Sequence, residues 1–72
     1  MAKLKYDRIY RDLRQKIESG EYPVQEFLPS EFRLIEEYEC SRNTVRRAIA
    51  DLTAQGYVQP LHGKGVRVIY QP

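Results

Sequence analysis

The sequence predicts an α+β fold in which three helices are followed by a two-stranded β-hairpin. Apolar residues recur at helical spacing in three segments, roughly 5–19, 30–38 and 41–55. A serine stands at the beginning of the second and of the third segment, where an N-cap is expected. Two short runs rich in β-branched and aromatic residues, 57–61 and 66–70, then follow a glycine. These observations set the order helix, helix, helix, hairpin.

The first helix is amphipathic and ends at a glycine. Its apolar face consists of Tyr6, Ile9, Leu13 and Ile17. Charged residues occupy the other faces, as expected of a helix that packs on one side. Gly20 follows as a stop signal. Residues 21–28 contain Pro23 and lack a helical period, which predicts a connector with a short extended piece at Phe27 and Leu28.

Two serines are predicted to cap the second and third helices. The hydroxyl of Ser30 can accept a hydrogen bond from a free N–H group of the first turn, and Ser41 can do the same one helix later. Glu31 adds a negative charge at the positive end of the helix dipole. Between the two helices, Glu39 and Cys40 form a brief turn that contains no glycine. The buried side of the second helix is expected to consist of Phe32, Leu34, Ile35 and Tyr38, and the apolar stripe of the third helix consists of Val45, Ala48, Ile49 and Leu52.

The hairpin begins directly after the third helix. Gly56 suits the left-handed position past a helix end, and Tyr57 is expected to pack back on Leu52. Residues 62–65 connect the two strands. Pro60 cannot donate a hydrogen bond to a ladder, so its strand should face solvent or a sheet edge at that point.

Together, these elements form the winged helix-turn-helix arrangement. Two helices joined by a tight turn, with a third packed across them, are typical of a helix-turn-helix, and the trailing hairpin is the wing. We expect this domain to span residues 1–70 and a linker to begin at residues 71–72. A plain structural module with the same elements is the alternative at this point.

Length and composition exclude several classes of function. A chain of 72 residues holds one small core, which leaves no room for a large enzyme scaffold. One cysteine and one histidine give no disulfide and no metal-ligand spacing, and no nucleophile, base and orienter set is visible. We therefore expect no catalytic residue, no metal and no cofactor. Because no apolar run reaches the ~18–20 residues of a membrane span and the N-terminal residues lack the apolar stretch of a signal peptide, we expect a cytoplasmic protein without membrane contact.

The charge is spread unevenly along the chain. The net charge is +2, but acidic residues gather in 21–39, whereas residues 40–72 carry five basic residues against one acidic residue. A localised positive surface is what nucleic-acid binding requires. Solvated faces give the same pattern, so the placement of the basic residues has to decide between the two interpretations.

The third helix carries its basic residues opposite its apolar stripe. Steps of about 100° from Arg42 put Arg46 at about 40° and Arg47 at about 140°, whereas the apolar residues span about 240–340°. Arg42 in the first turn opposes the helix dipole, which costs about 0.3–1 kcal/mol. The same position becomes favourable when an anion lies in front of the helix.

The side-chain types on that face match base edges in the major groove. Forked donors and acceptors make Arg42, Asn43 and Arg46 candidates for base contacts. Thr44 and Arg47 suit phosphate contacts better. Solvated surface ion pairs are the alternative for the arginines.

The hairpin turn places two cations between glycines. His62 and Lys64 alternate with Gly63 and Gly65, and a thin glycine-flanked turn can approach a phosphate or enter a minor groove. The G-x-x-x-x-G-K-[ST] spacing of a nucleotide-binding loop is not met. An ordinary exposed turn with a solubilising lysine is the alternative.

Three runs of this sequence, in order and spacing, resemble the winged-helix DNA-binding domain of the GntR family of bacterial transcription regulators. They are Leu28-Pro29-Ser30-Glu31, Ser41-Arg42-Asn43-Thr44-Val45-Arg46 and Gly63-Lys64-Gly65, accompanied by Ile17, Gly20, Ala48, Leu52 and Gly56-Tyr57. The resemblance covers almost the whole chain. The tyrosine-rich first helix of this sequence is most similar to that of the HutC-type branch. Sugar-responsive repressors of the family are also similar to this sequence.

The resemblance implies roles for particular residues. Arg42 and Arg46 are expected to contact operator DNA, with Ser41 and Thr44 at phosphates, and the wing glycine motif is expected to reach the minor groove. The DNA-binding residues predicted from all these observations are Ser30, Arg33, Ser41, Arg42, Asn43, Thr44, Arg46, Arg47, His62, Gly63, Lys64, Gly65 and Arg67.

The sequence departs from the family pattern in three places. Phe32 stands where many members have a DNA-contacting arginine, so that contact is expected to be lost or moved to Arg33. Val66 and Arg67 replace a threonine and an aromatic residue, and Arg67 would add a phosphate contact to the wing. Cys40 replaces a valine in the turn and keeps a packing role.

We therefore expect sequence-specific binding to double-stranded DNA by a transcription regulator, most simply a repressor. The start of the third helix would lie in the major groove of a palindromic operator half-site, and the hairpin tip in the minor groove. Family members are homodimers with a C-terminal domain that binds a small-molecule effector, so the chain is expected to be the N-terminal domain of a longer protein. A protein-interaction module, docking a partner through the hairpin and third helix, is the alternative.

Overall fold

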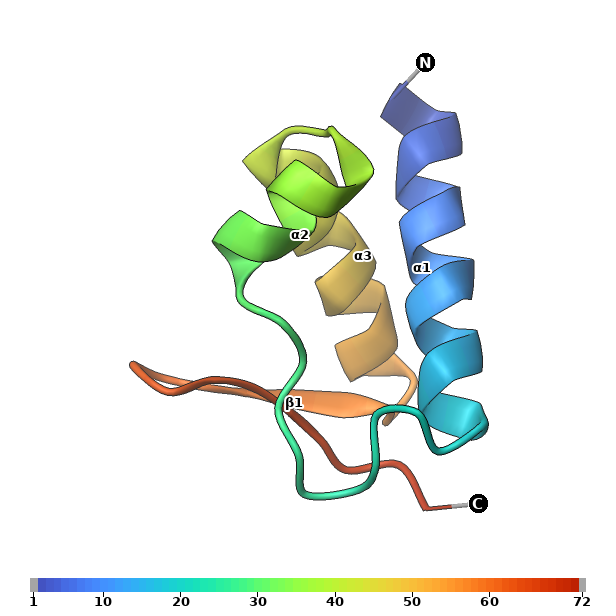
Figure 1. The fold of residues 1–72 in the computed structure, drawn as a ribbon, viewed down its shortest axis with the longest axis vertical. Coiled ribbons are helices and arrows are strands. Elements are labelled where there is room, and N and C mark those ends of the chain that lie inside the picture. Colours follow the sequence, from blue (N-terminus) through green and yellow to red (C-terminus); the bar gives the residue numbers. More distant parts are fainter. Residues whose placement is uncertain (1, 72) are drawn as a thin grey trace.

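A computed structural model confirms the predicted order of elements (Figure 1). It describes the backbone of residues 2–71 and the side chains of residues 6–71. The helices are α1 (Ala2–Glu18), α2 (Glu31–Tyr38) and α3 (Arg42–Ala54), and the strands are β1 (Val58–Leu61) and β2 (Gly65–Val68). Met1 of the predicted domain and Pro72 of the predicted linker lie outside the described residues.

The helix α1 is longer than predicted. It begins at Ala2, three residues before the expected start, because alanine, lysine and leucine favour a helix even where the apolar stripe has not yet begun. Its end agrees with the sequence: the helix stops at Glu18, and Gly20 adopts a positive φ of 88°. Within the described residues, no helix is both long and apolar enough to cross a membrane.

The core lies where α1 packs along α3, with the hairpin closing its lower end in Figure 1. The fully or almost fully buried side chains are Ile9, Leu13, Ile17, Leu28, Leu34, Val45, Ala48, Leu52, Tyr57, Val58 and Val68. The apolar stripes predicted for the first and third helices belong to this set, apart from Tyr6 and Ile49, which pack against its margin. On α2 the prediction was wrong for Phe32, which is 70% exposed because it lies about 200° around the helix from the buried Leu34. A hydrogen bond from the hydroxyl of Tyr38 to the carboxylate of Asp12 joins α2 to α1.

The turn between α2 and α3 is tight although it contains no glycine. Glu39 adopts the left-handed conformation, with φ 51° and ψ 54°, and its N–H group donates to the carbonyl of Ile35. Both predicted caps are confirmed. Ser30 Oγ accepts from the N–H of Arg33 at 3.1 Å, and Ser41 Oγ accepts from the N–H of Thr44 at 3.2 Å.

The end of α3 also follows the prediction. Gly56 has a φ of 82°, and its N–H donates to the carbonyl of Thr53 at 3.1 Å. The N–H of Tyr57 donates to the carbonyl of Leu52 at 2.9 Å. This pair of bonds satisfies the last carbonyls of the helix and turns the chain into the hairpin.

The hairpin is antiparallel, with Val58 opposite Val68 and Leu61 opposite Gly65. The connector adds to its other side. Leu28 N–H donates to the carbonyl of Val66 at 2.9 Å, and an isolated bridge joins residues 27 and 67. The extended piece predicted at residues 27–28 therefore pairs with β2 through an isolated bridge, which leaves β1 and its proline at the edge.

The second strand ends earlier than predicted. β2 stops at Val68 rather than at residue 70, because the N–H groups of Ile69 and Tyr70 both turn to the carbonyl of Tyr57, at 2.9 and 3.1 Å. The Tyr70 ring stacks on the Tyr57 ring with centroids 4.7 Å apart, and the Tyr57 hydroxyl donates to Glu18 Oε2 at 2.6 Å. These contacts tie the end of the chain to the end of α1.

Removing one hydroxyl should change how acid destabilises the fold. The hydrogen bond from Tyr57 lowers the pKa of Glu18; burial opposes this shift and Arg14 adds to it. A carboxylate with a lowered folded pKa stabilises the fold above its unfolded pKa and loses that contribution as pH falls through the folded pKa. Tyr57→Phe should therefore flatten the loss of unfolding free energy between neutral pH and about pH 3, measured by urea denaturation.

The matched control is Tyr10→Phe. The Tyr10 hydroxyl donates to the uncharged side chain of Gln55 at 2.7 Å, so its removal should leave the acid dependence unchanged. Wild-type acid dependence in Tyr57→Phe would contradict the assignment.

Candidate nucleic-acid interface

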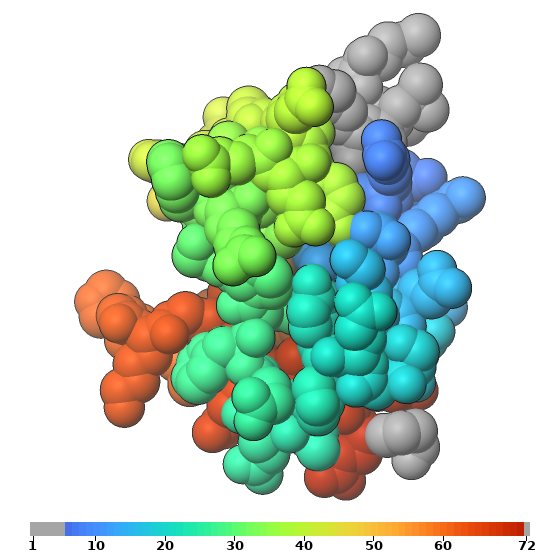
Figure 2. Space-filling model, in the orientation of Figure 1, coloured from blue at the N-terminus to red at the C-terminus, as the bar shows by residue number. Residues whose placement is uncertain are grey.

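Three segments that the sequence singles out meet on one side of the molecule. They are the beginning of α2, the beginning of α3 and the tip of the hairpin, all on the left side of Figure 1. Figure 2 shows the same segments in green, yellow and orange along the left side of the surface. The hairpin tip projects furthest from the helices.

The helix α3 divides its residues as predicted. Its inner face is buried, with Val45, Ala48 and Leu52 at most 1% exposed. Asn43 is fully on the solvent side, and the side chains of Arg42 and Arg46 are 66% and 61% exposed. The Ser41 cap fixes where the first turn begins, and so fixes the height of these side chains along the helix.

One carboxylate holds both arginines. Arg42 Nε lies 3.3 Å from Glu31 Oε1, and Arg46 Nε lies 2.8 Å from Glu31 Oε2. The surface ion pairs considered from the sequence are therefore present. The Arg46 contact is a hydrogen bond that uses one of the five N–H donors of its guanidinium, the Arg42 contact is an ion pair, and both side chains remain mostly in water. Glu31 therefore positions two guanidinium groups side by side without burying them.

Sequence reasoning missed this role of Glu31. It placed the carboxylate at the start of its own helix, whereas the structure shows that it also offsets the charge of Arg42 at the start of α3. The spacing between the helices hides the pair, because the two residues are joined only after the turn at Glu39 closes. The Leu-Pro-Ser-Glu run was the available signal.

The two hydroxyl groups near the start of α3 are hydrogen-bonded to each other. Ser41 Oγ and Thr44 Oγ1 lie 2.8 Å apart, while Ser41 also caps the helix. Ser30 is exposed and caps α2 in the same way. Both caps place a hydroxyl at a helix end whose other N–H groups point toward the solvent.

Three predicted residues stand apart from this cluster. The guanidinium of Arg47 lies over the Tyr6 ring, 4.8 Å from its centroid, and so faces α1. Arg33 borders a shallow hollow with two glutamates, 36 and 37, further along α2. Arg67 lies within the sheet opposite Gln59, and its Nε is buried without a hydrogen-bond partner among the described residues.

The hairpin tip is fully exposed. His62, Gly63, Lys64 and Gly65 all lie in solvent, and the N–H of Lys64 donates to the carbonyl of Leu61 at 2.9 Å. Gly65 has a φ of 112°, which side chains rarely adopt, and Phe27 packs 3.5 Å from the position that its Cβ would take. The glycine is thus required by the backbone of the turn.

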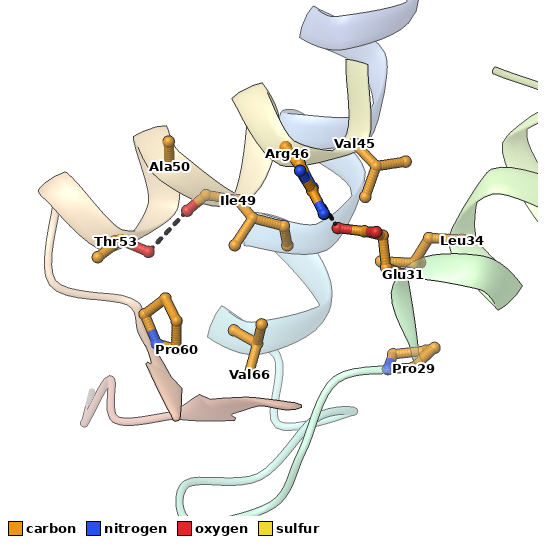
Figure 3. Close-up of a pocket in the computed structure, with 10 residues that line it drawn as sticks. All are labelled: Pro29, Glu31, Leu34, Val45, Arg46, Ile49, Ala50, Thr53, Pro60 and Val66. Atoms are coloured by element: carbon orange, nitrogen blue, oxygen red, sulfur yellow. Dashed lines mark hydrogen bonds and ion pairs between the residues drawn. The ribbon is translucent and has the colours of Figure 1, made fainter. Parts of the chain in front are cut away.

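A groove of about 420 Å³ runs between α3 and the hairpin (Figure 3). The Glu31–Arg46 ion pair lies at one end, Ile49 lies on the helix side, and Pro60 and Val66 lie on the hairpin side. The walls of the groove come from three segments that are distant in the sequence, so no sequence motif predicts it.

Comparison with known proteins places the chain among bacterial regulators. The family model described as "Bacterial regulatory proteins, gntR family" matches residues 5–68. The HTH-type transcriptional regulator TreR of Bacillus subtilis is 45% identical over 65 residues, which cover 90% of this chain and 27% of that protein. The histidine utilization repressor of Pseudomonas putida is 36% identical over 63 residues, which cover 88% of this chain and 25% of that protein. The chain thus spans about a quarter of the length of these relatives.

Solved structures share the fold. The crystal structure of AraR(DBD) in complex with operator ORR3 has a TM-score of 0.87 and 31% sequence identity, and the match covers 89% of this chain and 77% of that chain. A putative GntR-family transcriptional regulator has a TM-score of 0.84 and 37% identity, and the match covers 94% of this chain and 27% of that chain. The winged helix-turn-helix predicted from the sequence is confirmed.

Removing either arginine should leave the fold nearly as stable as before. Exposed ion pairs contribute about 0–1 kcal/mol, so Arg42→Ala and Arg46→Ala should each change the unfolding free energy by less than about 1 kcal/mol in urea denaturation. Ser41→Ala, which removes the cap of the same helix, should cost about 1 kcal/mol. A loss of several kcal/mol on removing either arginine would show that the pair is structural.

Proposed function

Because this chain belongs to the GntR family of bacterial regulatory proteins, we propose that it binds double-stranded operator DNA as a transcription regulator. The observation that carries the proposal is the pair of exposed guanidiniums, Arg42 and Arg46, held side by side by Glu31 at the start of α3. The operator complex of the related AraR(DBD) supports DNA as the partner.

The start of α3 is proposed to enter the major groove. An α-helix fits this groove, and its exposed first turn presents Arg42, Asn43 and Arg46 to the base edges. Two guanidiniums around one carboxylate leave one net positive charge and most of their N–H donors for guanine acceptors. Glu31 is then a positioning residue, because it fixes the separation of the two forks.

Phosphate contacts are proposed on either side of this helix. Ser30, Ser41 and Thr44 carry hydroxyls at or near helix ends, where N–H groups and the dipole favour an anion. Arg47 would have to leave the Tyr6 ring to reach a phosphate, and Arg33 would have to leave its two glutamate neighbours. The contact proposed for Arg67 requires it to extend out of the sheet.

The hairpin tip is proposed to lie in the adjacent minor groove. His62 and Lys64 supply the cations, and Gly63 and Gly65 keep the turn thin. In this arrangement α3 lies in the major groove of the DNA and the hairpin tip lies in the adjacent minor groove. The protein groove between α3 and the hairpin would then lie across the sugar–phosphate backbone that separates the two DNA grooves.

The full-length protein is proposed to be a homodimeric repressor. The chain covers about a quarter of its relatives, so the remaining length of such a protein can hold a domain that binds a small-molecule effector and a second copy. Two domains would then occupy the half-sites of a palindromic operator in the cytoplasm. Occupancy of the DNA regulates transcription, without a catalysed reaction.

Binding should depend steeply on salt and on Arg46. Affinity for a duplex enriched by this chain from a random pool should fall with a log–log slope of about −0.9 per neutralised phosphate, measured by fluorescence anisotropy. Arg46→Ala should cost about 1–3 kcal/mol of binding free energy and relax the base preference.

The matched control is Arg11→Ala. Arg11 is also exposed, at 77%, and pairs with Asp7 on α1, so its loss should leave the base preference unchanged. A flat response between low and physiological salt would instead favour a protein-interaction module.

The glycine at the end of the hairpin tip should matter for DNA binding beyond its effect on stability. Gly65→Val places a side chain at a φ of 112°, so the tip should change shape and affinity for the enriched duplex should fall severalfold. Gly20→Val places the same strain at a φ of 88°, with nothing within 4 Å, far from the proposed interface. Equal DNA affinity of the two variants, at equal stability, would show that the tip is not used.

A further inference from the structure

Phe32 has the largest exposed fraction among the large apolar side chains of the described residues, at 70%. Single apolar residues are common on protein surfaces and need no explanation by themselves. The position of this one is what distinguishes it. It directly follows Glu31, whose carboxylate binds Arg42 and Arg46. The backbone of Phe32 therefore lies beside the first two turns of α3.

The helix α2 directs this ring away from the core. Leu34 is 1% exposed and lies about 200° from Phe32 around the helix, so the two side chains point to nearly opposite sides. The first turn of α2, which carries Phe32, is on the same side of the molecule as the hairpin tip (Figure 1). An exposed apolar ring is thus carried by the residue that directly follows Glu31, whose carboxylate binds the two guanidiniums.

A phenyl ring can meet only some parts of a DNA duplex favourably. It has no donor or acceptor for a phosphate, and covering a phosphate without a hydrogen bond costs free energy. On the floor of the major groove, the prominent apolar group is the C5-methyl of thymine. The guanidiniums that Glu31 binds would read the neighbouring base pairs.

We propose that Phe32 is a specificity-determining residue that packs on the C5-methyl group of a thymine in the operator. The inference rests on the proposed function and deepens it, because it names a base that the arginines do not read. One thymine in each half-site is selected by van der Waals contact, beside positions selected by hydrogen bonds.

The test is to remove the methyl group from the DNA. A duplex is enriched from a random pool with the chain itself, and each thymine is then replaced in turn by deoxyuridine. The wild-type chain should lose about fourfold in affinity at one thymine in each half-site, the value expected for one buried methyl group. Phe32→Ala should bind the thymine and deoxyuridine duplexes equally, and a pool enriched by this variant should no longer fix that thymine.

Two further variants make the result specific. Phe32→Leu retains an apolar side chain and should retain part of the discrimination, and it serves as the second variant if Phe32→Ala folds poorly by circular dichroism. Val24→Ala removes another exposed apolar side chain, 38% exposed in the connector, and should keep the full fourfold discrimination.

The outcomes separate this inference from the proposed function. If deoxyuridine has no effect on the wild-type chain while Arg46→Ala abolishes binding to both duplexes, the role of Phe32 is overturned. The proposed DNA-binding function stands in that case. Unchanged discrimination in Phe32→Ala would also overturn it. If the chain enriches no duplex at all, the proposed function and this inference fall together.

Discussion

Burial of one face of α3 against α1 is the constraint on which the rest of the structure depends. Val45, Ala48 and Leu52 are withdrawn from water by this contact, and a helix with a fixed inner face has a fixed outer face. Because the apolar face of α3 is turned toward the core, the arginines on its opposite face are exposed to solvent. The cost of placing a cation at the start of a helix is offset by a carboxylate from α2, so packing and electrostatics act at the same corner of the fold.

The elements that the sequence predicts well are those whose signals are local. Caps at Ser30 and Ser41 and the left-handed Gly56 involve residues within one turn of each other, so their geometry follows from residue type. Helix starts and strand ends are less local. The early start of α1 and the early end of β2 depend respectively on propensity outside the apolar stripe and on the carbonyl of Tyr57, which captures two later N–H groups.

The candidate interface is predictable in part for the same reason. Helical spacing alone separates the basic face of α3 from its apolar face, and the glycines mark the hairpin tip. Contacts between distant segments are not visible in spacing. Three such contacts form only when the chain is folded: the Glu31 ion pairs, the Arg47 guanidinium over the Tyr6 ring, and the isolated bridge at Phe27. The orientation of the predicted site residues therefore depends on tertiary structure.

The stacked rings of Tyr57 and Tyr70 also fix the direction in which the polypeptide leaves the domain. Backbone hydrogen bonds from residues 69 and 70 hold that exit near the end of α1, remote from the hairpin tip in Figure 1. Any polypeptide attached there would begin at a position held by backbone hydrogen bonds and ring stacking. Because the N–H of Tyr57 in turn bonds to the carbonyl of Leu52, a displacement of residues 69 and 70 would act first on the last turn of α3.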